Sequence, residues 1–567
     1  MALSFDDYMN QPFATRITLV FLSNGSTNYY LSDLPYITDI FGSPNHTAFN
    51  HIISKSGLPR INWKISDPLS GHAVKTYGDL KLSTYLLNDG TDLRQVNLRG
   101  FDVTVKLVAP YHLYSINNAV LLFTGKVGKT QGDVKGGFTL VITDKQHEIN
   151  SISIPPNRYD ATLEGPNFPQ SSDGRVKPLT FGSPWKTEPV LIDQANLWYQ
   201  WHDVSDVIAV GVKQIFDNGS LLEYVQNAVG GSNTTVQFPS GDSSSINDYY
   251  NETRIYFLTG NNAGQNRKIL DYDGSTHTAT VNTLPYSMSG GDTFKVELYE
   301  DDTNNGRFRL LSTPAGQVTV DADGALYKNI PDTSAGDILE LILTRFGGMS
   351  LPDLSINITS LDDPLNGIYL KESIRLSELV SRICRAQLAW WSFDRAGKFI
   401  AKHFTSPEVS ATQTFYKTDI FNLSWSTDEF IVWRFVSQFH INWTILTAPN
   451  VLLTEPIKRT YRTAFYESVD EDLTVKSNFN NAIEFPHLSY SIAAGPPTGI
   501  VSELKNLFGV ERYSAKIEVP LKLPLLNLGD TIEINIGDSF LDGNWLVRGI
   551  GERLGGVVPT QELELWR

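Results

Sequence analysis

Apolar and polar side chains alternate along much of the first part of the chain. In segment 101–107 apolar residues occupy every second position, which is the pattern of a strand with one buried face. Further β-branched runs are separated from it by Asn, Gly and Asp, and they lie at 16–21, 119–127 and 138–143. The glycine-rich segment 128–137 is predicted to be a hairpin tip. We therefore predict a β-barrel domain over residues 1–155.

The next part of the chain mixes strands, loops and an insert. A passage rich in proline between 154 and 178 leads to two predicted strands, at 197–202 and 206–216. Residues 220–298 contain five brief strands between Ser-, Asn- and Gly-rich loops, which predicts a small inserted all-β domain. The five strands are expected at 234–238, 254–259, 267–272, 278–281 and 293–298. Residues 156–219 and 299–410 are then two parts of one middle region.

Helical periodicity is recognised only within this middle region. Ser334 begins a capping-box-like segment, and Gly347 and Gly348 end the helix that follows. A second helix has an apolar face made by Leu376, Leu379, Val380, Ile383, Cys384 and Gln387. It leads into a hairpin whose turn is expected at 394–397. The middle region is therefore predicted to be small and α+β, with two short helices.

From residue 411 the chain is again rich in β-type patterns. The clearest predicted strands lie at 430–435, 439–445, 515–519, 531–536, 542–548 and 562–566. The last of these ends within a residue of the C-terminus, and we expect sheet pairing to hold it. Residues 411–567 are predicted to form a second β-barrel domain. The predicted fold class is mainly β and multidomain.

Composition narrows the possible functions. The 567 residues carry a net charge of −16, which disfavours tight, non-specific binding of nucleic-acid phosphates. Cys384 is the single cysteine, so an intrachain disulfide and a cysteine-based zinc site are excluded. The N-terminal segment does not have the pattern of a secretory signal, and no run of 18 apolar residues predicts a transmembrane helix.

No motif in the sequence supports catalysis. G-x-S-x-G, H-E-x-x-H and a phosphate-binding glycine loop are all missing. His202 could be a catalytic base, but a surface role at a strand end is the preferred interpretation. The segments 271–274 and 321–324 resemble calcium loops without the full ligand set, so tight turns are predicted. Solvated loops are predicted for the acidic pairs and runs, at Asp6-Asp7, Asp301-Asp302, Asp362-Asp363 and Asp470-Glu471-Asp472.

Packing roles are predicted for the other candidate residues. Cys384 lies on the apolar face of its helix and is interpreted as a small core residue. Trp390 and Trp391, like Trp198 and Trp201, could stack on sugars or bases, but their apolar neighbours favour packing. We therefore predict no catalytic, cofactor-binding or metal-binding residues.

The order of the segments is more specific than any single motif. A strand-glycine hairpin at 123–144 comes first, and the later segments follow in a fixed order: 174–185 (GRVKPLTFGSPW), 197–203 (LWYQWHD), 388–399 (LAWWSFDRAGKF), 525–534 (LLNLGDTIEI) and 542–549 (DGNWLVRG). Together they resemble the baseplate hub (tail hub) proteins of tailed bacteriophages. The insert, with its segment 259–274, is similar to a small β-domain inserted in several phage tail proteins.

The resemblance implies a homotrimeric structural protein of the tail tip and not an enzyme. Each subunit would contribute two tail-tube-like barrels, 1–155 and 411–567, to a ring of six that continues the tail tube. The implied partners are a distal tail or tail tube ring, a central fibre or spike protein and the tape-measure protein. The implied location is the virion, after assembly in the host cytoplasm. DNA would pass through the lumen without specific binding, and we expect acids of the terminal barrels to line it.

Two alternatives remain open from the sequence. The chain could be a carbohydrate- or receptor-binding tail protein with a lectin-like insert, which could also contact the host surface. It could also be a tail-associated glycan hydrolase, which requires two carboxylates facing each other in a cleft.

Overall fold

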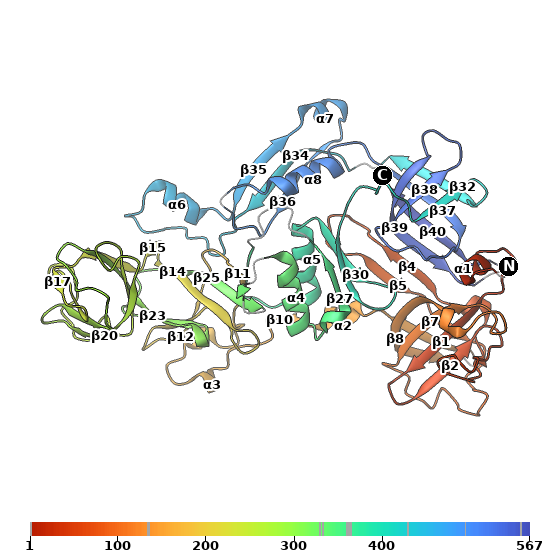
Figure 1. Ribbon diagram of the computed structural model, residues 1–567, viewed down its shortest axis with the longest axis horizontal. Coiled ribbons are helices and arrows are strands. Elements are labelled where there is room, and N and C mark those ends of the chain that lie inside the picture. The colour runs from red at the N-terminus through yellow and green to blue at the C-terminus, as the bar shows by residue number, and fades with distance from the viewer. Residues whose placement is uncertain are drawn as a thin grey trace.

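The computed structural model describes residues 3–132, 137–327, 330–331, 334–358, 366–427, 430–493, 495–555 and 558–567. The molecule is elongated: the two terminal parts of the chain lie side by side at one end, and the insert lies at the other (Figure 1). Strands dominate and form several separate sheets, which confirms the mainly β, multidomain class. Within the described residues, no helix is long and apolar enough to cross a membrane.

The N-terminal part forms a seven-stranded sheet curved into a half-barrel. Its strand order is β3 (Asn50–His51), β2 (Asn28–Ser32), β1 (Ile17–Ser23), β7 (Asp102–Val108), β8 (Val120–Gly132), β9 (Phe138–Thr143) and β6 (Leu80–Leu82). Val103 and Val105 of β7 are fully buried while their neighbours are not, as the alternation predicts. β8 and β9 form the expected hairpin, but residues 128–132 of the predicted tip belong to β8, which pairs with β9 as far as Gly132–Phe138. Residues 133–136 lie outside the described residues.

The C-terminal part forms the second half-barrel, which takes two strands from the N-terminal part. Its own strands are β32 (Gln413–Tyr416), β38 (Thr531–Asn535), β39 (Gly543–Arg553), β40 (Thr560–Trp566), β37 (Tyr513–Pro520) and β33 (Asn422–Thr427). β4 (Arg60–Lys64) pairs with the second half of β39, and β5 (Val74–Tyr77) pairs with β4. A segment from the predicted first barrel is thus built into the sheet of the second.

A separate three-stranded sheet interrupts the C-terminal part, and here the predictions were wrong. The strand expected at 430–435 extends further, as β34 (Val432–Phe439), and pairs with β35 (Tyr466–Glu471) and β36 (Ile483–Leu488). The second strand, expected at 439–445, is not formed, since residues 440–445 lie beyond the end of β34. Helices outside the middle region were also missed, among them α6 (Glu455–Arg462), α7 (Leu473–Asn478) and α8 (Thr498–Phe508). Apolar residues at helical spacing, Ile500, Leu504 and Leu507, are the signal that could have revealed α8.

The middle region contains the two predicted helices, α4 (Ala335–Arg345) and α5 (Leu376–Ala386). The Ser334 hydroxyl accepts from the Asp337 N–H at 3.1 Å, so the predicted cap is present. Short helices α2 (Gln146–Ser151) and α3 (Ala161–Glu164) lie before them, and α1 (Phe5–Met9) lies near the N-terminus. The expected hairpin is also present, as β30 (Ala389–Phe393) and β31 (Phe399–His403), with β27 (Leu354–Asn357) on the other side of β31.

Small sheets complete the middle region. They pair β10 (Ser153–Ile154) with β29 (Ile374–Arg375), β11 (Leu179–Gly182) with β28 (Gly367–Leu370), and four strands in the order β12 (Val190–Asp193), β13 (Trp198–Gln200), β24 (Arg307–Leu310), β23 (Tyr299–Asp302). A further sheet has the order β15 (Ser220–Leu221), β14 (Ala209–Asp217), β25 (Val318–Tyr327), β26 (Ile330–Pro331). Asp321 and Asp323 lie within β25, so the tight turn predicted at 321–324 is wrong.

The insert is a sheet of seven strands around its own core. The order is β16 (Glu223–Asn227), β22 (Thr293–Glu297), β19 (Arg254–Phe257), β20 (Asn266–Asp273), β21 (Thr278–Val281), β18 (Thr235–Gln237) and β17 (Gly230–Gly231). Phe238, Tyr272 and Phe294 are buried together at its centre. In this sheet β20 carries Asp271 and Asp273, and the predicted turn begins only after Asp273.

Candidate functional site: the junction between the terminal sheets

A tight turn of the middle region enters the gap between the two terminal sheets. The hairpin β30–β31 ends in the turn 394–397, where Asp394 accepts from the backbone N–H of Lys398 at 2.8 Å. Gly397 has φ +75°, a conformation that glycine adopts readily. A Cβ at Gly397 would lie 2.6 Å from Oγ1 of Thr124 on β8, so the turn and the N-terminal sheet are in close contact. The turn thereby holds Arg395 at the junction.

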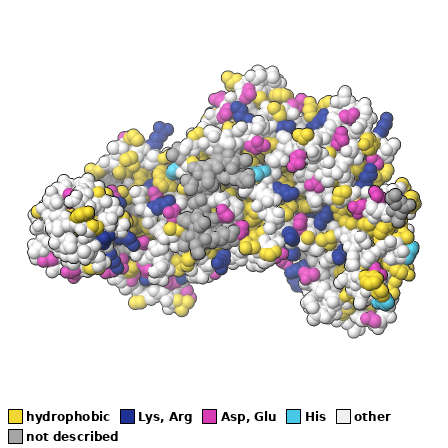
Figure 2. Space-filling view, viewed as in Figure 1, with side chains coloured by type: hydrophobic (Ala, Val, Ile, Leu, Met, Phe, Trp, Pro, Cys, Tyr) yellow, Lys and Arg dark blue, Asp and Glu magenta, His cyan; other side chains and the backbone are white. Residues whose placement is uncertain are grey.

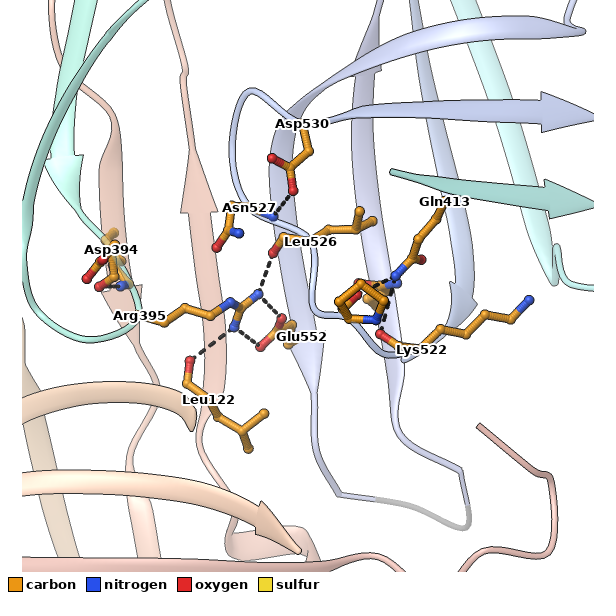
Figure 3. Close-up of polar contacts among 12 residues, drawn as sticks. Leu122, Asp394, Arg395, Gln413, Lys522, Leu526, Asn527, Asp530 and Glu552 are labelled. Atoms are coloured by element: carbon orange, nitrogen blue, oxygen red, sulfur yellow. Dashed lines mark hydrogen bonds and ion pairs between the residues drawn. The ribbon is translucent and has the colours of Figure 1, made fainter. Parts of the chain in front are cut away.

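Arg395 binds groups from both terminal sheets at once (Figure 3). Its Nη1 donates to the carbonyl of Leu122 on β8 at 3.0 Å, and its Nη2 donates to the carbonyl of Leu526 at 2.7 Å. Both Nη atoms also contact the carboxylate of Glu552 on β39, at 3.1 and 2.5 Å. A bidentate Arg–carboxylate pair fixes direction as well as distance. This guanidinium therefore joins the N-terminal sheet, the C-terminal sheet and the middle region.

The Arg395–Glu552 pair is removed from solvent. The Glu552 side chain is fully buried, and that of Arg395 is 11% exposed. Taking either charge away leaves the other without a partner in the protein interior, which is costly. The junction is consequently a place where the two sheets cannot separate without exposing or isolating a charge.

Lys75 makes a second connection at the same turn. Its Nζ donates to the carbonyls of Phe393 at 3.1 Å and Asp394 at 2.8 Å, and it lies 4.7 Å from the Trp63 ring centre. Burial lowers the pKa of Lys75 to about 8, against the opposing effect of Asp144. Lys75 is on β5, so its hydrogen bonds connect the strands β4 and β5, which belong to the C-terminal sheet, to the hairpin β30–β31 of the middle region.

Apolar contacts and hydrogen bonds between a side-chain amide and the backbone also hold the two terminal sheets together. Leu521, Leu523 and Leu554 of the C-terminal part are buried in the core of the N-terminal sheet. The side-chain amide of Asn10 accepts from the Leu523 N–H at 2.7 Å and donates to the Leu523 carbonyl at 3.0 Å. Trp63 of β4 is buried in the core of the C-terminal sheet. The two sheets therefore share core residues in both directions.

Charges on the C-terminal sheet are arranged in pairs of opposite sign. Lys64 and Lys516 both contact Glu564, the latter at 3.1 Å, and Arg60 contacts Glu562 at 3.4 Å. Acidic and basic side chains are also interspersed over the face drawn in Figure 2. The acidic excess of the chain is thus not gathered on these strands, and the acid-lined lumen stays a prediction.

His202 is buried, so its predicted surface role is wrong. Its Nδ1 accepts from the Thr180 N–H at 3.1 Å, and its Nε2 then donates to the Val207 carbonyl at 2.8 Å. Burial lowers the pKa of His202 to about 4, which keeps the ring neutral. With both ring nitrogens bound to backbone, this side chain has a structural role and no free nitrogen for proton transfer.

The other candidate residues are placed as follows. Cys384, Trp390 and Trp391 are buried, as predicted, and Trp201 is fully buried while Trp198 is partly exposed. Asp301 and Asp302 lie on β23 and not in a loop, and Asp472 caps α7. Asp362 and Asp363 lie outside the described residues. Over the described part of the chain, no group of three or more His, Cys, Asp or Glu side chains is placed to hold a metal ion.

Comparison with known proteins finds remote likenesses in structure. No family model matches the chain, and no curated protein matches it in sequence. A 43 kDa tail protein of prophage MuSo2 from Shewanella oneidensis is similar over 97% of this chain and 98% of its own, at 8% identity and a TM-score of 0.40. A tail protein from Neisseria meningitidis is similar over 97% and 96%, at 8% identity and a TM-score of 0.38.

A chain in the virion of a native gene transfer agent particle is similar over 70% of this chain and 85% of its own, at 12% identity and a TM-score of 0.32. Likenesses at such TM-scores do not define a function, so the geometry of the junction carries the conclusion below.

Proposed function

We propose that this chain is a structural component of a bacteriophage tail tip: a homotrimeric baseplate hub that continues the tail tube. The observation that carries the proposal is the fixed, side-by-side position of two half-barrel sheets from the two ends of one chain. Three such chains around an axis present six half-barrel sheets, so a threefold assembly could meet a sixfold tube. The shared core residues and the Arg395–Glu552 pair hold the two sheets in a fixed position relative to each other.

An exposed sheet edge supports assembly with further copies. β33 ends the strand order of the C-terminal sheet, and among the described residues it pairs with β37 alone. Most of its residues are exposed, and the Trp425 side chain is 50% exposed. A long unpaired edge with an exposed aromatic residue favours pairing with another chain. We assign this edge to the contact between neighbouring subunits.

The charge pattern supports a conduit that does not retain DNA. Retention of a nucleic acid requires Lys and Arg free to replace the counterions of its phosphates. On the C-terminal sheet Lys64, Lys516 and Arg60 are instead paired with carboxylates. In this proposal DNA passes through the hub ring without being retained. A tail tube ring binds one end of the hub ring, and a central fibre or spike binds the other end. The tape-measure protein occupies the lumen before ejection.

The oligomeric mass of the purified chain tests the assembly. Light scattering should give three times the 63.2 kDa mass of the chain. Trp425→Lys, which places a charge on the β33 edge, should shift the mass towards the monomer. Leu270→Lys alters a side chain of the insert with a similar exposure, 46%, and should leave the mass unchanged. A wild-type monomer, or equal effects of both variants, would contradict the proposal.

A further inference from the structure

A groove separate from the junction lies between α5 and the first part of the chain. One wall is the exposed face of α5, and the other is formed by the loop at Ser70 and His72 together with Gln146 and Asn150 of α2. Its volume is about 700 Å³, within the range of ordinary ligand sites.

The two walls of the groove are fixed to each other. A Cβ at Gly71 would lie 2.1 Å from the Ser381 carbonyl oxygen, so the loop lies directly against α5. Trp391 forms part of the floor, where its indole N–H donates to the Ser381 hydroxyl at 2.8 Å and its backbone N–H donates to the Gly71 carbonyl at 3.2 Å. The groove is therefore preformed.

The α5 wall carries positive charge that the described residues do not neutralise. Arg375, Arg382 and Arg385 recur at helical spacing on this face. Arg382 is paired with Glu378 at 2.5 Å, whereas Arg375 and Arg385 have no carboxylate partner among the described residues. Two exposed guanidinium groups without a partner are unexpected in a chain with a net charge of −16. Guanidinium groups bind carboxylates in bidentate fashion, so the wall fits a ligand with at least two carboxylates.

The remaining groups favour a peptide over a nucleic acid. The Asn150 amide and the side-chain carbonyl of Gln146 offer the donor and acceptors that extended backbone requires, whereas the Ser70 hydroxyl is already bonded to the carbonyls of Asp67 and His72. Single-stranded nucleic acids bind by stacking bases on exposed aromatic rings. Two aromatic rings line the groove: Trp391 is only 3% exposed, and His72 is a single, partly buried imidazole, so the described residues of the groove provide no stacking platform for successive bases. Glu378 between the arginines would also repel a continuous run of phosphates.

We propose that this groove binds an acidic, extended peptide segment of a partner protein, with two of its carboxylates on Arg375 and Arg385. The site would be a docking point for a partner chain on the outside of α5. It does not depend on the β33 edge or on the oligomeric state, so its failure would leave the proposed function unaffected.

Fluorescence anisotropy with the full-length chain tests the site. Labelled hexaglutamate should bind, hexalysine should not, and raised ionic strength should weaken the binding because the contacts are largely electrostatic. The variant R375E/R385E should lose roughly 30-fold or more in affinity. R99E/K417E makes the same change in net charge at two exposed residues outside the groove, and it should bind as the wild type does.

Three results would overturn the inference. One is hexaglutamate binding no tighter than hexalysine, and another is equal loss of affinity in the two double variants. The third is a thymidine oligonucleotide that binds as tightly as hexaglutamate and shares its sensitivity to R375E/R385E, since the groove would then be a nucleic-acid site. Circular dichroism of both variants checks that the fold is retained.

Discussion

Replacing Arg395 by methionine should loosen the contact between the terminal sheets. Methionine keeps much of the side-chain length and removes the charge and every hydrogen bond of the guanidinium. Glu552, fully buried, would then have lost its partner, and the carbonyls of Leu122 and Leu526 would lose their donor. The perturbation removes a guanidinium that binds groups of both terminal parts of the chain at once.

The expected cost follows from the burial of the pair. Breaking a buried ion pair by removing one partner costs about 3–5 kcal/mol. Because the Arg395 side chain is 11% exposed, some water can reach the site, and the lower end, about 3 kcal/mol, applies. Arg60→Met is the matched control. It breaks an ion pair between Arg60 of β4 and Glu562 of β40, whose side chains are 44% and 39% exposed. An exposed pair of this kind contributes about 0–1 kcal/mol.

Hydrogen exchange measured by mass spectrometry reports the local stability of β4 and β39 separately from the rest of this multidomain chain. For R395M the exchange of these strands should accelerate on the order of 100-fold, because each 1.4 kcal/mol is about tenfold. The double variant R395M/E552M should recover part of this loss, since no isolated charge remains. Exchange in R395M that equals that of R60M, or a double variant worse than R395M alone, would refute the reasoning.

Three further perturbations test other parts of the junction and the core. His202 has a folded-state pKa of about 4 against about 6.5 unfolded, so the unfolded chain binds more protons between these values. Stability therefore falls as the pH drops from 6.5 to 4. In urea titrations His202→Gln should reduce this dependence of stability on pH, and an unchanged dependence would contradict the assignment. Lys75 has its pKa lowered to about 8 against about 10.5 unfolded, so between these values the folded chain has released the proton that the unfolded chain still binds, and stability should rise by about 2 kcal/mol from pH 7 to pH 10. Lys75→Met should lessen that rise, and an equal rise in the variant would count against the assignment. Gly397→Ala should lower the local stability of β8 by about 1–2 kcal/mol, as measured by hydrogen exchange, because alanine disfavours φ +75° and its Cβ would clash with Thr124. A neutral effect would show that the turn can move away from β8.

Local patterns allowed many elements to be predicted from the sequence. The strands at Phe138–Thr143 and Thr278–Val281 have the predicted bounds, because β-branched runs and flanking turn residues are both local signals. The start of α4 followed from Ser334. In contrast, the sequence at 321–324 predicts a turn because Asp321 and Asp323 resemble a loop motif. In the structure Lys186 and Lys213 from distant segments pair with these carboxylates within β25.

The junction could not be predicted, because it depends on contacts between segments far apart in sequence. Arg395 and Glu552 are 157 positions apart, and nothing near either residue in sequence indicates the other. Residues 60–64 have a strand pattern, but the pattern does not say that they pair with β39 and not with the N-terminal sheet. Composition indicated the −16 charge but not its distribution into pairs on the C-terminal sheet.

Electron microscopy of the purified, full-length chain tests the central claim most directly. We predict a threefold ring with a central opening, in which both terminal sheets of each chain border the opening and give six densities. The insert should project away from the axis. A single copy, or a ring in which only one of the two terminal sheets reaches the opening, would contradict the account.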